Sequence, residues 1–201
     1  VTREMNEKSD VDIVPILINN YALRKFKTVR DKNKEVLKPA ELLPITITEL
    51  RKNKNSKLHG KLKGRPDTFL RDLEHYKLIC GKKISKSDYP MRVIDNMFTD
   101  EIMTLRYKTI PLYFKGKFGF SQLIKQVFWI SYFEQKSLGR MPPRTWKGLN
   151  NFIKNKNHIV HRAYYFRMYP TKNKRKRGKF IISLKNYLDS LDATRAVPHP
   201  K

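Results

Sequence analysis

The sequence predicts an α+β fold: a small mixed core of several helices with a β-hairpin bearing a basic tip, plus long basic loops and an extended N-terminal arm. Three observations predict it. Apolar residues recur at helical spacing in residues 67–80 and 121–136, which indicates helices. Apolar and polar residues alternate in 160–169 and again in 179–185, as they do in paired strands. Residues 51–66 are basic, contain no acid and lack apolar periodicity, which is typical of a loop.

The first element is an apolar run, VDIVPILI, that begins at Val11. Pro15 interrupts it, and because proline has no N–H to donate to a sheet, we expect an edge strand or an extended arm. The basic segment at 51–66 has two interpretations, a solvated linker or a contact with phosphates. The expected domains are an extended arm and basic loop over 1–66 and a compact basic α+β domain over 67–201.

The first expected helix follows residue 66, in the stretch DTFLRDLEHYKLIC. Asp67 or Thr68 is the expected cap at its start, since short polar side chains bond the free N–H groups there. Its apolar residues at helical spacing are Phe69, Leu73, Tyr76 and Cys80.

The second expected helix begins at Ser121, in SQLIKQVFWISYFEQK. Apolar residues cover so much of its circumference that it should be largely buried. Gly139, Pro142 and Pro143 end the segment. A further short helix then carries an apolar stripe made of Trp146, Leu149 and Ile153.

The β-hairpin is expected between His158 and Leu188, in HIVHRAYYFRMYPTKNKRKRGKFIISLKNYL. Pro170 and Gly178 bracket the turn, which leaves residues 170–178 as the basic tip. The return run is also compatible with a helix through IISLKNYLDSLDA, and this alternative stays open. The residues expected on one face are Val160, Tyr164, Phe166 and Met168 on the first strand and Phe180, Ile182 and Leu184 on the second.

The chain carries a formal net charge of +26, from 44 Lys plus Arg against 18 Asp plus Glu. Between Ile102 and Leu188, 20 basic residues accompany a single acid, Glu134. Such charge disfavours a compact state unless an anionic partner neutralises it. The phosphates of nucleic acid are the commonest such partner, and an anionic membrane is the main alternative. Because no apolar run of about 18 residues occurs, membrane insertion is not expected.

The cations of the expected tip are the first candidates for contact with nucleic acid, because each cation placed against a phosphate releases condensed counterions. The run KNKRKR also has the density of a nuclear-import signal. Nearby, Tyr164, Tyr165 and Tyr169 either stack on splayed RNA bases or are half-buried strand residues. The candidate nucleic-acid-binding residues are Lys172, Lys174, Arg175, Lys176, Arg177, Lys179, Arg167, Arg162, Arg144, Lys147, Lys115, Lys117, Lys61, Lys63 and Arg65.

The stretch KGKFGFSQL, from Lys115 to Leu123, resembles the RNP1 segment of RRM domains, which implies aromatic residues that stack on bases. It departs from that pattern because Lys117 is an insertion and Ser121 stands at an aliphatic position. A basic hairpin turn around Gly116 accounts for the stretch better.

A DNA-binding alternative uses a helix-turn-helix-like pair at 121–155. The second helix of this pair would expose polar and basic residues toward the groove. The link from Ser137 to Pro143 is longer than the usual turn of about 3–4 residues in this motif.

No pattern for catalysis or metal binding is found. His158 and His161, in a strand, would point to opposite faces, and the single cysteine, Cys80, cannot form a thiolate cage. Asp67, Asp72 and Glu74 superficially resemble a nuclease site, but the basic half almost lacks the carboxylates that such chemistry gathers around a metal. We expect no enzyme, no metal, no cofactor and no small-molecule substrate.

The sequence therefore predicts a structural RNA-binding component of a large ribonucleoprotein that contacts RNA and neighbouring proteins. A ribosomal protein of the mitochondrion is favoured, from the Lys- and Asn-rich composition and a start at Val1 that fits a removed targeting segment. The nucleus or nucleolus is the alternative compartment. The alternative functions are a DNA-binding factor of chromatin, replication or mobile elements, and a basic nuclease or toxin domain.

Overall fold

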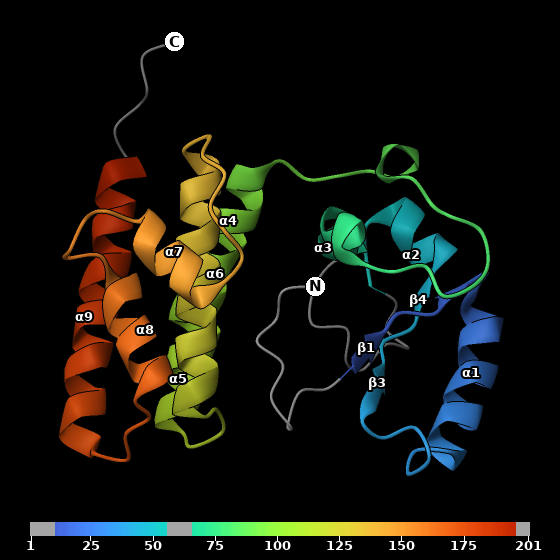
Figure 1. Cartoon of the computed structure of the whole chain (residues 1–201), viewed down its shortest axis with the longest axis horizontal. Helices are drawn as coiled ribbons and strands as arrows, with labels where there is room; N and C mark the ends of the chain where they lie inside the picture. The colour runs from blue at the N-terminus through green and yellow to red at the C-terminus, as the bar shows by residue number, and fades with distance from the viewer. Residues whose placement is uncertain (1–10, 56–65, 196–201) are drawn as a thin grey trace. The chain divides into compact units, whose positions relative to one another are not determined.

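The computed structural model describes residues 11–55 and 66–195, and contacts divide the chain into two compact units, Val1–Arg92 (unit 1) and Val93–Lys201 (unit 2) (Figure 1). The sequence predicted a division at residue 66 instead. The helix after residue 66 belongs to unit 1 because its Phe69 and Leu70 share a core with Ile45 and Leu50. The first 92 residues therefore contain a hydrophobic core of their own.

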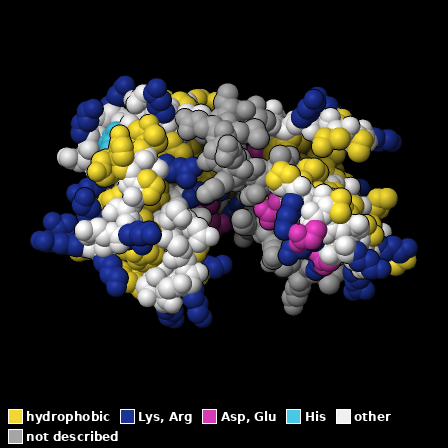
Figure 2. Space-filling model, turned by 60° about the horizontal axis from the view of Figure 1, so that its bottom comes forward, with side chains coloured by type: hydrophobic (Ala, Val, Ile, Leu, Met, Phe, Trp, Pro, Cys, Tyr) yellow, Lys and Arg dark blue, Asp and Glu magenta, His cyan; other side chains and the backbone are white. Residues whose placement is uncertain are grey.

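The two units differ in surface charge. On the face that Figure 2 draws, Lys and Arg side chains lie on both units, and most of the visible Asp and Glu side chains lie on unit 1, at the right. Unit 2 contains 22 Lys and Arg against six acids, Asp95, Asp100, Glu101, Glu134, Asp189 and Asp192. The positive charge of unit 2 is therefore little compensated from within.

Unit 1 begins with a parallel βαβ arrangement. Pro15 separates β1 from β2, and Pro44 separates β3 from β4. Because proline has no N–H to donate, the hydrogen bonding between the paired segments is interrupted there. The run VDIVPILI does form strands, but the arm over 1–66 is not extended in its described part, because a helix and a small core fold it. The elements are β1 (Val11–Ile13) paired with β3 (Ala40–Leu42), β2 (Ile16–Leu17) paired with β4 (Ile45–Thr46), and α1 (Asn20–Lys32) between them.

The short helix α2 (Ile47–Lys52) starts with a capping box. Thr46 Oγ1 accepts a hydrogen bond from Glu49 N at 3.1 Å, and Glu49 Oε2 accepts one from Thr46 N at 2.9 Å. Both residues are buried, so this reciprocal pair satisfies backbone groups that water cannot reach. The long basic loop predicted at 51–66 begins only after α2, and most of it lies outside the described residues.

Helix α3 (Pro66–Asp72) is shorter than the helix predicted up to Cys80. A 3₁₀ turn, Leu73–His75, follows it and ends at Tyr76, whose backbone is extended, and a second 3₁₀ turn spans Lys86–Asp88. The ring centroids of Phe69 and Tyr76 lie 5.2 Å apart, whereas residues seven apart in a helix are separated by about 10.5 Å. The chain therefore folds back after α3, and the predicted continuation of the helix is wrong.

Asp67 does not cap α3 but forms a buried ion pair with Arg92. The carboxylate is fully buried, and it accepts hydrogen bonds from Arg92 Nε at 2.8 Å, Arg92 Nη2 at 3.2 Å and Arg92 N at 3.2 Å. Burial by itself would raise the pKa of this carboxyl, but the hydrogen bonds and charge of Arg92 outweigh it and hold the pKa below its usual 3.8. Arg71 donates to the backbone carbonyl of Arg92, so the pair fixes the end of unit 1 to α3.

Replacing Asp67 by asparagine should destabilise unit 1 by about 3 kcal/mol, because it leaves a buried guanidinium without its counter-charge. Hydrogen exchange at the amides of Phe69 and Leu70 should accelerate about a hundredfold. In the wild type, the stability from this carboxylate is present above pH 3.8 and is lost as the pH falls below it, because the folded-state pKa is the lower one. Asp31→Asn, at an exposed pair, is the control and should change neither quantity. An equal effect of the two substitutions would contradict this role for Asp67.

Unit 2 is helical throughout the residues that the structure describes. Its elements are α4 (Ile94–Thr104), a π-helical segment (Leu105–Thr109), α5 (Ile110–Phe114), α6 (Phe120–Ser137), α7 (Trp146–Phe152), α8 (Ile159–Met168) and α9 (Lys174–Arg195). The π segment lies directly before Pro111, which lacks an N–H, and there Ile110 N bonds to Leu105 O. Among the described residues, no helix is long and apolar enough to cross a membrane.

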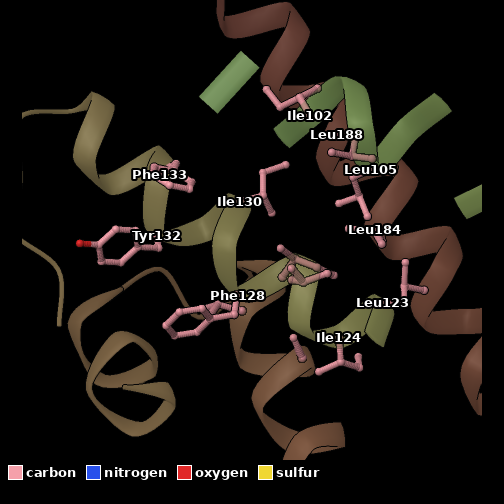
Figure 3. Packing of buried hydrophobic residues seen from close by; sticks show 14 of the residues in the cluster. Ile102, Leu105, Leu123, Ile124, Phe128, Ile130, Tyr132, Phe133, Leu184 and Leu188 are labelled. Carbon is pink, nitrogen blue, oxygen red and sulfur yellow. The ribbon is translucent and has the colours of Figure 1, made fainter. Parts of the chain in front are cut away.

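Helix α6 forms the centre of unit 2, between α4 and α8 (Figure 1). Its side chains Leu123, Ile124, Val127 and Ile130 are almost completely buried, as its apolar circumference predicted. Figure 3 shows α6 residues packed together with Leu184 and Leu188 of α9 and Leu105 before α5. The predictions of a buried helix from Ser121 and of a short helix with Trp146 and Leu149 are confirmed.

The hairpin predicted between His158 and Leu188 is wrong, because α8 and α9 occupy these residues. The apolar residues of the first run also fit a helix, since Ile159, Val160, Ala163 and Phe166 lie on one side of α8. The helical alternative for the return run is correct. The expected basic tip is therefore the link 169–173 together with the first turn of α9.

Candidate nucleic-acid interface

The first turn of α9 consists of cations. Asn173 caps it, since its Oδ1 accepts a hydrogen bond from Lys176 N at 3.0 Å, and no acid lies in this turn. Lys174, Arg175 and Lys176 are exposed. A helix N-terminus carries partial positive charge, so cations there raise the local potential where acids would be more favourable.

Arg177 differs from its neighbours because it takes part in the packing. Its Nε donates to Thr171 O at 2.8 Å, and its guanidinium lies 4.9 Å from the ring centroid of Phe120. These contacts hold the start of α9 against the start of α6. Arg177 therefore has a structural role in addition to its charge.

The contact between Arg177 and Phe120 brings two distant basic segments to one end of unit 2. The α5–α6 link, with Gly116 in the left-handed region at φ +68°, lies at the same end as the α8–α9 link (Figure 1). The turn predicted around Gly116 is present, although it joins two helices and not two strands. We call this region the basic end; its residues are Lys115, Lys117, Arg167, Lys172, Lys174, Arg175, Lys176, Arg177 and Lys179.

The remaining candidates lie elsewhere. Arg144 is half-buried, with its guanidinium 5.5 Å from the ring centroid of Trp129, so it packs on α6. Lys147 is exposed on α7, and Arg162 donates to Ser183 Oγ of α9. The other three, Lys61, Lys63 and Arg65, lie outside the described residues.

The α6–α7 pair offers little to a DNA groove. Residues 138–145 link the two helices, and α7 has seven residues. Asn150 Oδ1 lies 2.8 Å from His161 Nδ1, so this amide is used within the fold. Arg144, which precedes α7, also packs within the fold, so Lys147 and Asn151 are the exposed polar side chains of α7.

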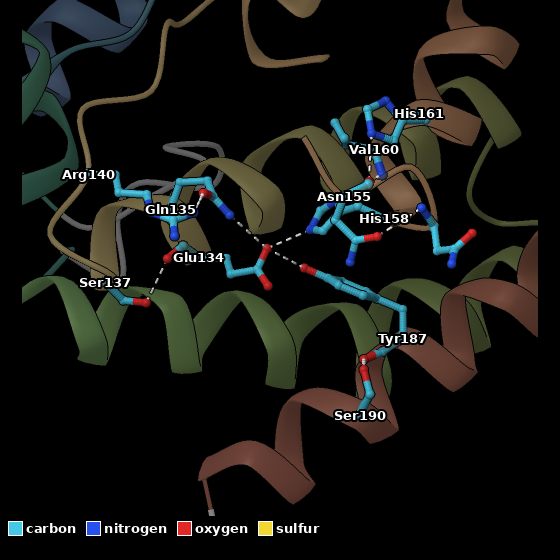
Figure 4. A network of polar contacts seen from close by, with 11 residues as sticks. Glu134, Gln135, Ser137, Arg140, Asn155, His158, Val160, His161, Tyr187 and Ser190 are labelled. Carbon is cyan, nitrogen blue, oxygen red and sulfur yellow. Dashed lines mark hydrogen bonds and ion pairs between the residues drawn. The ribbon is translucent and has the colours of Figure 1, made fainter. Parts of the chain in front are cut away.

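Glu134, the single acid between Ile102 and Leu188, lies at the centre of a buried polar network (Figure 4). Its Oε2 accepts hydrogen bonds from His158 Nε2 at 2.6 Å and from the Tyr187 hydroxyl at 2.9 Å. His158 Nδ1 accepts from Val160 N at 3.1 Å, which places the ring proton on Nε2. The network joins α6, α8 and α9 through side chains that are not among the predicted site residues.

The residues that resembled a metal or nuclease site have other partners. His158 bonds to Glu134, while His161 Nε2 lies 2.9 Å from Asn155 O. Asp67 pairs with Arg92, and Glu74 Oε2 lies 3.0 Å from Lys86 Nζ. Within residues 11–55 and 66–195, no group of three or more His, Cys, Asp or Glu side chains is placed to hold a metal ion.

Comparison of the chain with protein-family models, with curated proteins and with solved structures found no match.

Proposed function

We propose that this protein is a structural RNA-binding component of a large ribonucleoprotein and that the basic end of unit 2 contacts the RNA. The observation that carries the proposal is the charge at the start of α9. Cations fill its first turn and no acid lies there, which is the reverse of what the helix dipole favours at an N-terminus. Cations at this helix end lower the stability of unit 2, and a phosphate polymer bound at the basic end would offset that loss.

The α5–α6 link supports the proposal independently. Lys115 and Lys117 come from a segment more than 50 residues before Lys172, yet both links lie at one end of the unit. Several exposed cations at one end of a unit can engage successive phosphates of one RNA strand, which a scattered distribution cannot do. The mitochondrial ribosome is the particle that we favour, on the Lys- and Asn-rich composition, with neighbouring proteins as further partners.

RNA is preferred over duplex DNA on the geometry of α7. A DNA-reading helix uses about three or four side chains near its start to contact base edges, but here Arg144 packs on Trp129 and Asn150 bonds to His161. The basic end, in contrast, presents its cations on links and a helix start, which suits an irregular phosphate path.

The salt dependence of RNA binding tests the proposal. We expect the substitution of Lys172, Lys174, Arg175 and Lys176 by serine to reduce the slope of log affinity against log salt by about 3 and to weaken binding about a hundredfold at low salt. Arg177 is left unchanged because it packs on Phe120. The measurement is fluorescence anisotropy with a structured RNA, a duplex DNA and a single strand across a salt series.

The matched control removes the same charge from unit 1, where Lys32, Lys34, Arg51 and Lys52 are exposed. Serine at these four positions should leave the RNA slope nearly unchanged. Equal losses from the two variants would mean that net charge and not the basic end determines binding. Preference of the wild type for duplex DNA over RNA would overturn the proposal.

A further inference from the structure

Two exposed tyrosines lie at the C-terminal end of α8, Tyr165 in its last turn and Tyr169 directly after it. Tyr165 is 52% and Tyr169 is 65% exposed, and their ring centroids lie 5.2 Å apart with 44° between the planes. The core side of this helix consists of other residues, among them Val160 and Ala163, which are completely buried. The two rings therefore form an aromatic surface that stays exposed when α8 packs against its neighbours.

Cations border this aromatic surface on the neighbouring helix. Helices α8 and α9 run antiparallel, with the ring centroids of Phe166 and Phe180 5.4 Å apart and Arg162 bonded to Ser183. The end of α8, which Tyr169 directly follows, therefore lies beside the first turns of α9, where Lys176 and Lys179 are exposed. Exposed aromatic rings and exposed cations thus lie on adjacent helix ends at the basic end.

We infer that Tyr165 and Tyr169 form a stacking platform for unpaired RNA bases, so that the RNA segment held at the basic end is single-stranded. In a duplex the faces of the bases are covered by their neighbours, and only splayed nucleotides offer a face to a tyrosine ring. A cationic path beside stacked aromatic rings is the usual construction of single-strand sites, because cations follow the backbone while the rings accept any base. This inference rests on the proposed function, since it names the form of RNA that the same surface binds.

The test compares a uridine oligonucleotide of about 12 residues with an RNA duplex of similar length, both by anisotropy. The double variant Tyr165→Leu and Tyr169→Leu should bind the single strand about 30-fold more weakly and the duplex with unchanged affinity. Tyr165→Phe with Tyr169→Phe keeps both rings and should retain binding. The matched control is Tyr21→Leu with Tyr107→Leu, which removes rings that are 65% and 66% exposed elsewhere, and it should have no effect.

The outcomes separate this inference from the proposed function. If the wild type binds the duplex as well as the single strand, or if the leucine variant loses no affinity for the oligonucleotide, the platform is refuted while the RNA-binding proposal stands. Unchanged RNA binding by the leucine variant, together with loss of a protein partner, would assign the two rings to a protein contact. If the wild type binds neither RNA at low salt, both the inference and the proposed function fail.

Discussion

Replacing Glu134 by alanine is expected to lower the free energy of unfolding of unit 2 by about 3 kcal/mol, because two buried donors lose their acceptor. His158 Nε2 and the Tyr187 hydroxyl bond to the same carboxylate oxygen, at 2.6 Å and 2.9 Å. The His158 ring cannot turn to another acceptor without giving up its bond to Val160 N. Urea unfolding of the full chain, followed by tryptophan fluorescence, measures the loss in unit 2 alone, since both tryptophans, Trp129 and Trp146, lie there.

Two further variants apportion this loss. Glu134→Gln keeps one acceptor oxygen and should cost about 1 kcal/mol, while Asp189→Ala removes an exposed acid that pairs with Arg106 and should cost less than about 1 kcal/mol. If Glu134→Ala and Asp189→Ala destabilise the protein equally, the network does not support the fold as described.

Alkaline unfolding gives a second measure of the same network. Burial, followed by the negative charge of Glu134 and the hydrogen bond to it, raises the pKa of Tyr187 well above its usual 10.0. Because the folded-state pKa is the higher one, the stability due to the neutral phenol is complete below pH 10 and declines as the pH rises above it. Tyr187→Phe should make this decline shallower.

The helices of unit 2 differ in how far the sequence predicts them. The apolar residues of α6 recur over 18 residues, long enough for the helical period to be unambiguous. In α8, the same apolar residues fit both a strand and a helix, and the aromatic and β-branched content favours the strand. The helix forms because one side of α8, with Val160 and Ala163, packs on neighbouring helices, a tertiary contact that a local pattern does not contain.

The strands of unit 1 are also hard to predict from local sequence, because they are short and pair over a long distance in the chain. β1 and β3 have three residues each and β2 and β4 have two, too short for any alternation to be recognised. Parallel pairing also joins residues about 29 positions apart, such as Val11 with Ala40. Only VDIVPILI carried a local signal for these pairs.

The sequence predicts which basic residues belong to the candidate site, but it does not predict how they are arranged in space. The basic run KNKRKR can be read directly from the sequence. Its proximity to Lys115 and Lys117 cannot, because it follows from the packing of α9 on α6. Glu134 was visible as a lone acid on a helix expected to be buried, which is a signal for a buried polar contact. Its partners His158 and Tyr187 lie 24 and 53 residues away, so no spacing rule could have identified them.

Reversing charge in the first turn of α9 should change stability and RNA affinity in opposite directions. Lys174→Glu with Arg175→Glu places acids at the positive end of the helix dipole, which should raise the free energy of unfolding of unit 2 by about 1–2 kcal/mol. For a chain of this size, the melting temperature should rise by about 2–6 °C. The same change adds repulsion to phosphates at the basic end, so RNA affinity at low salt should fall at least about a hundredfold.

The matched control is Arg24→Glu with Lys25→Glu, which makes the same change of charge in the middle of α1, away from either helix end. It should leave the unfolding of unit 2 unchanged and reduce RNA affinity only slightly, through net charge. If the α9 variant loses stability as well as affinity, the cations of the first turn stabilise the folded protein, and an anionic partner is not needed to explain them. If it gains stability and still binds RNA with wild-type affinity, the RNA contacts a different surface. RNA bound at the basic end would be repelled by the two introduced glutamates and would lose affinity.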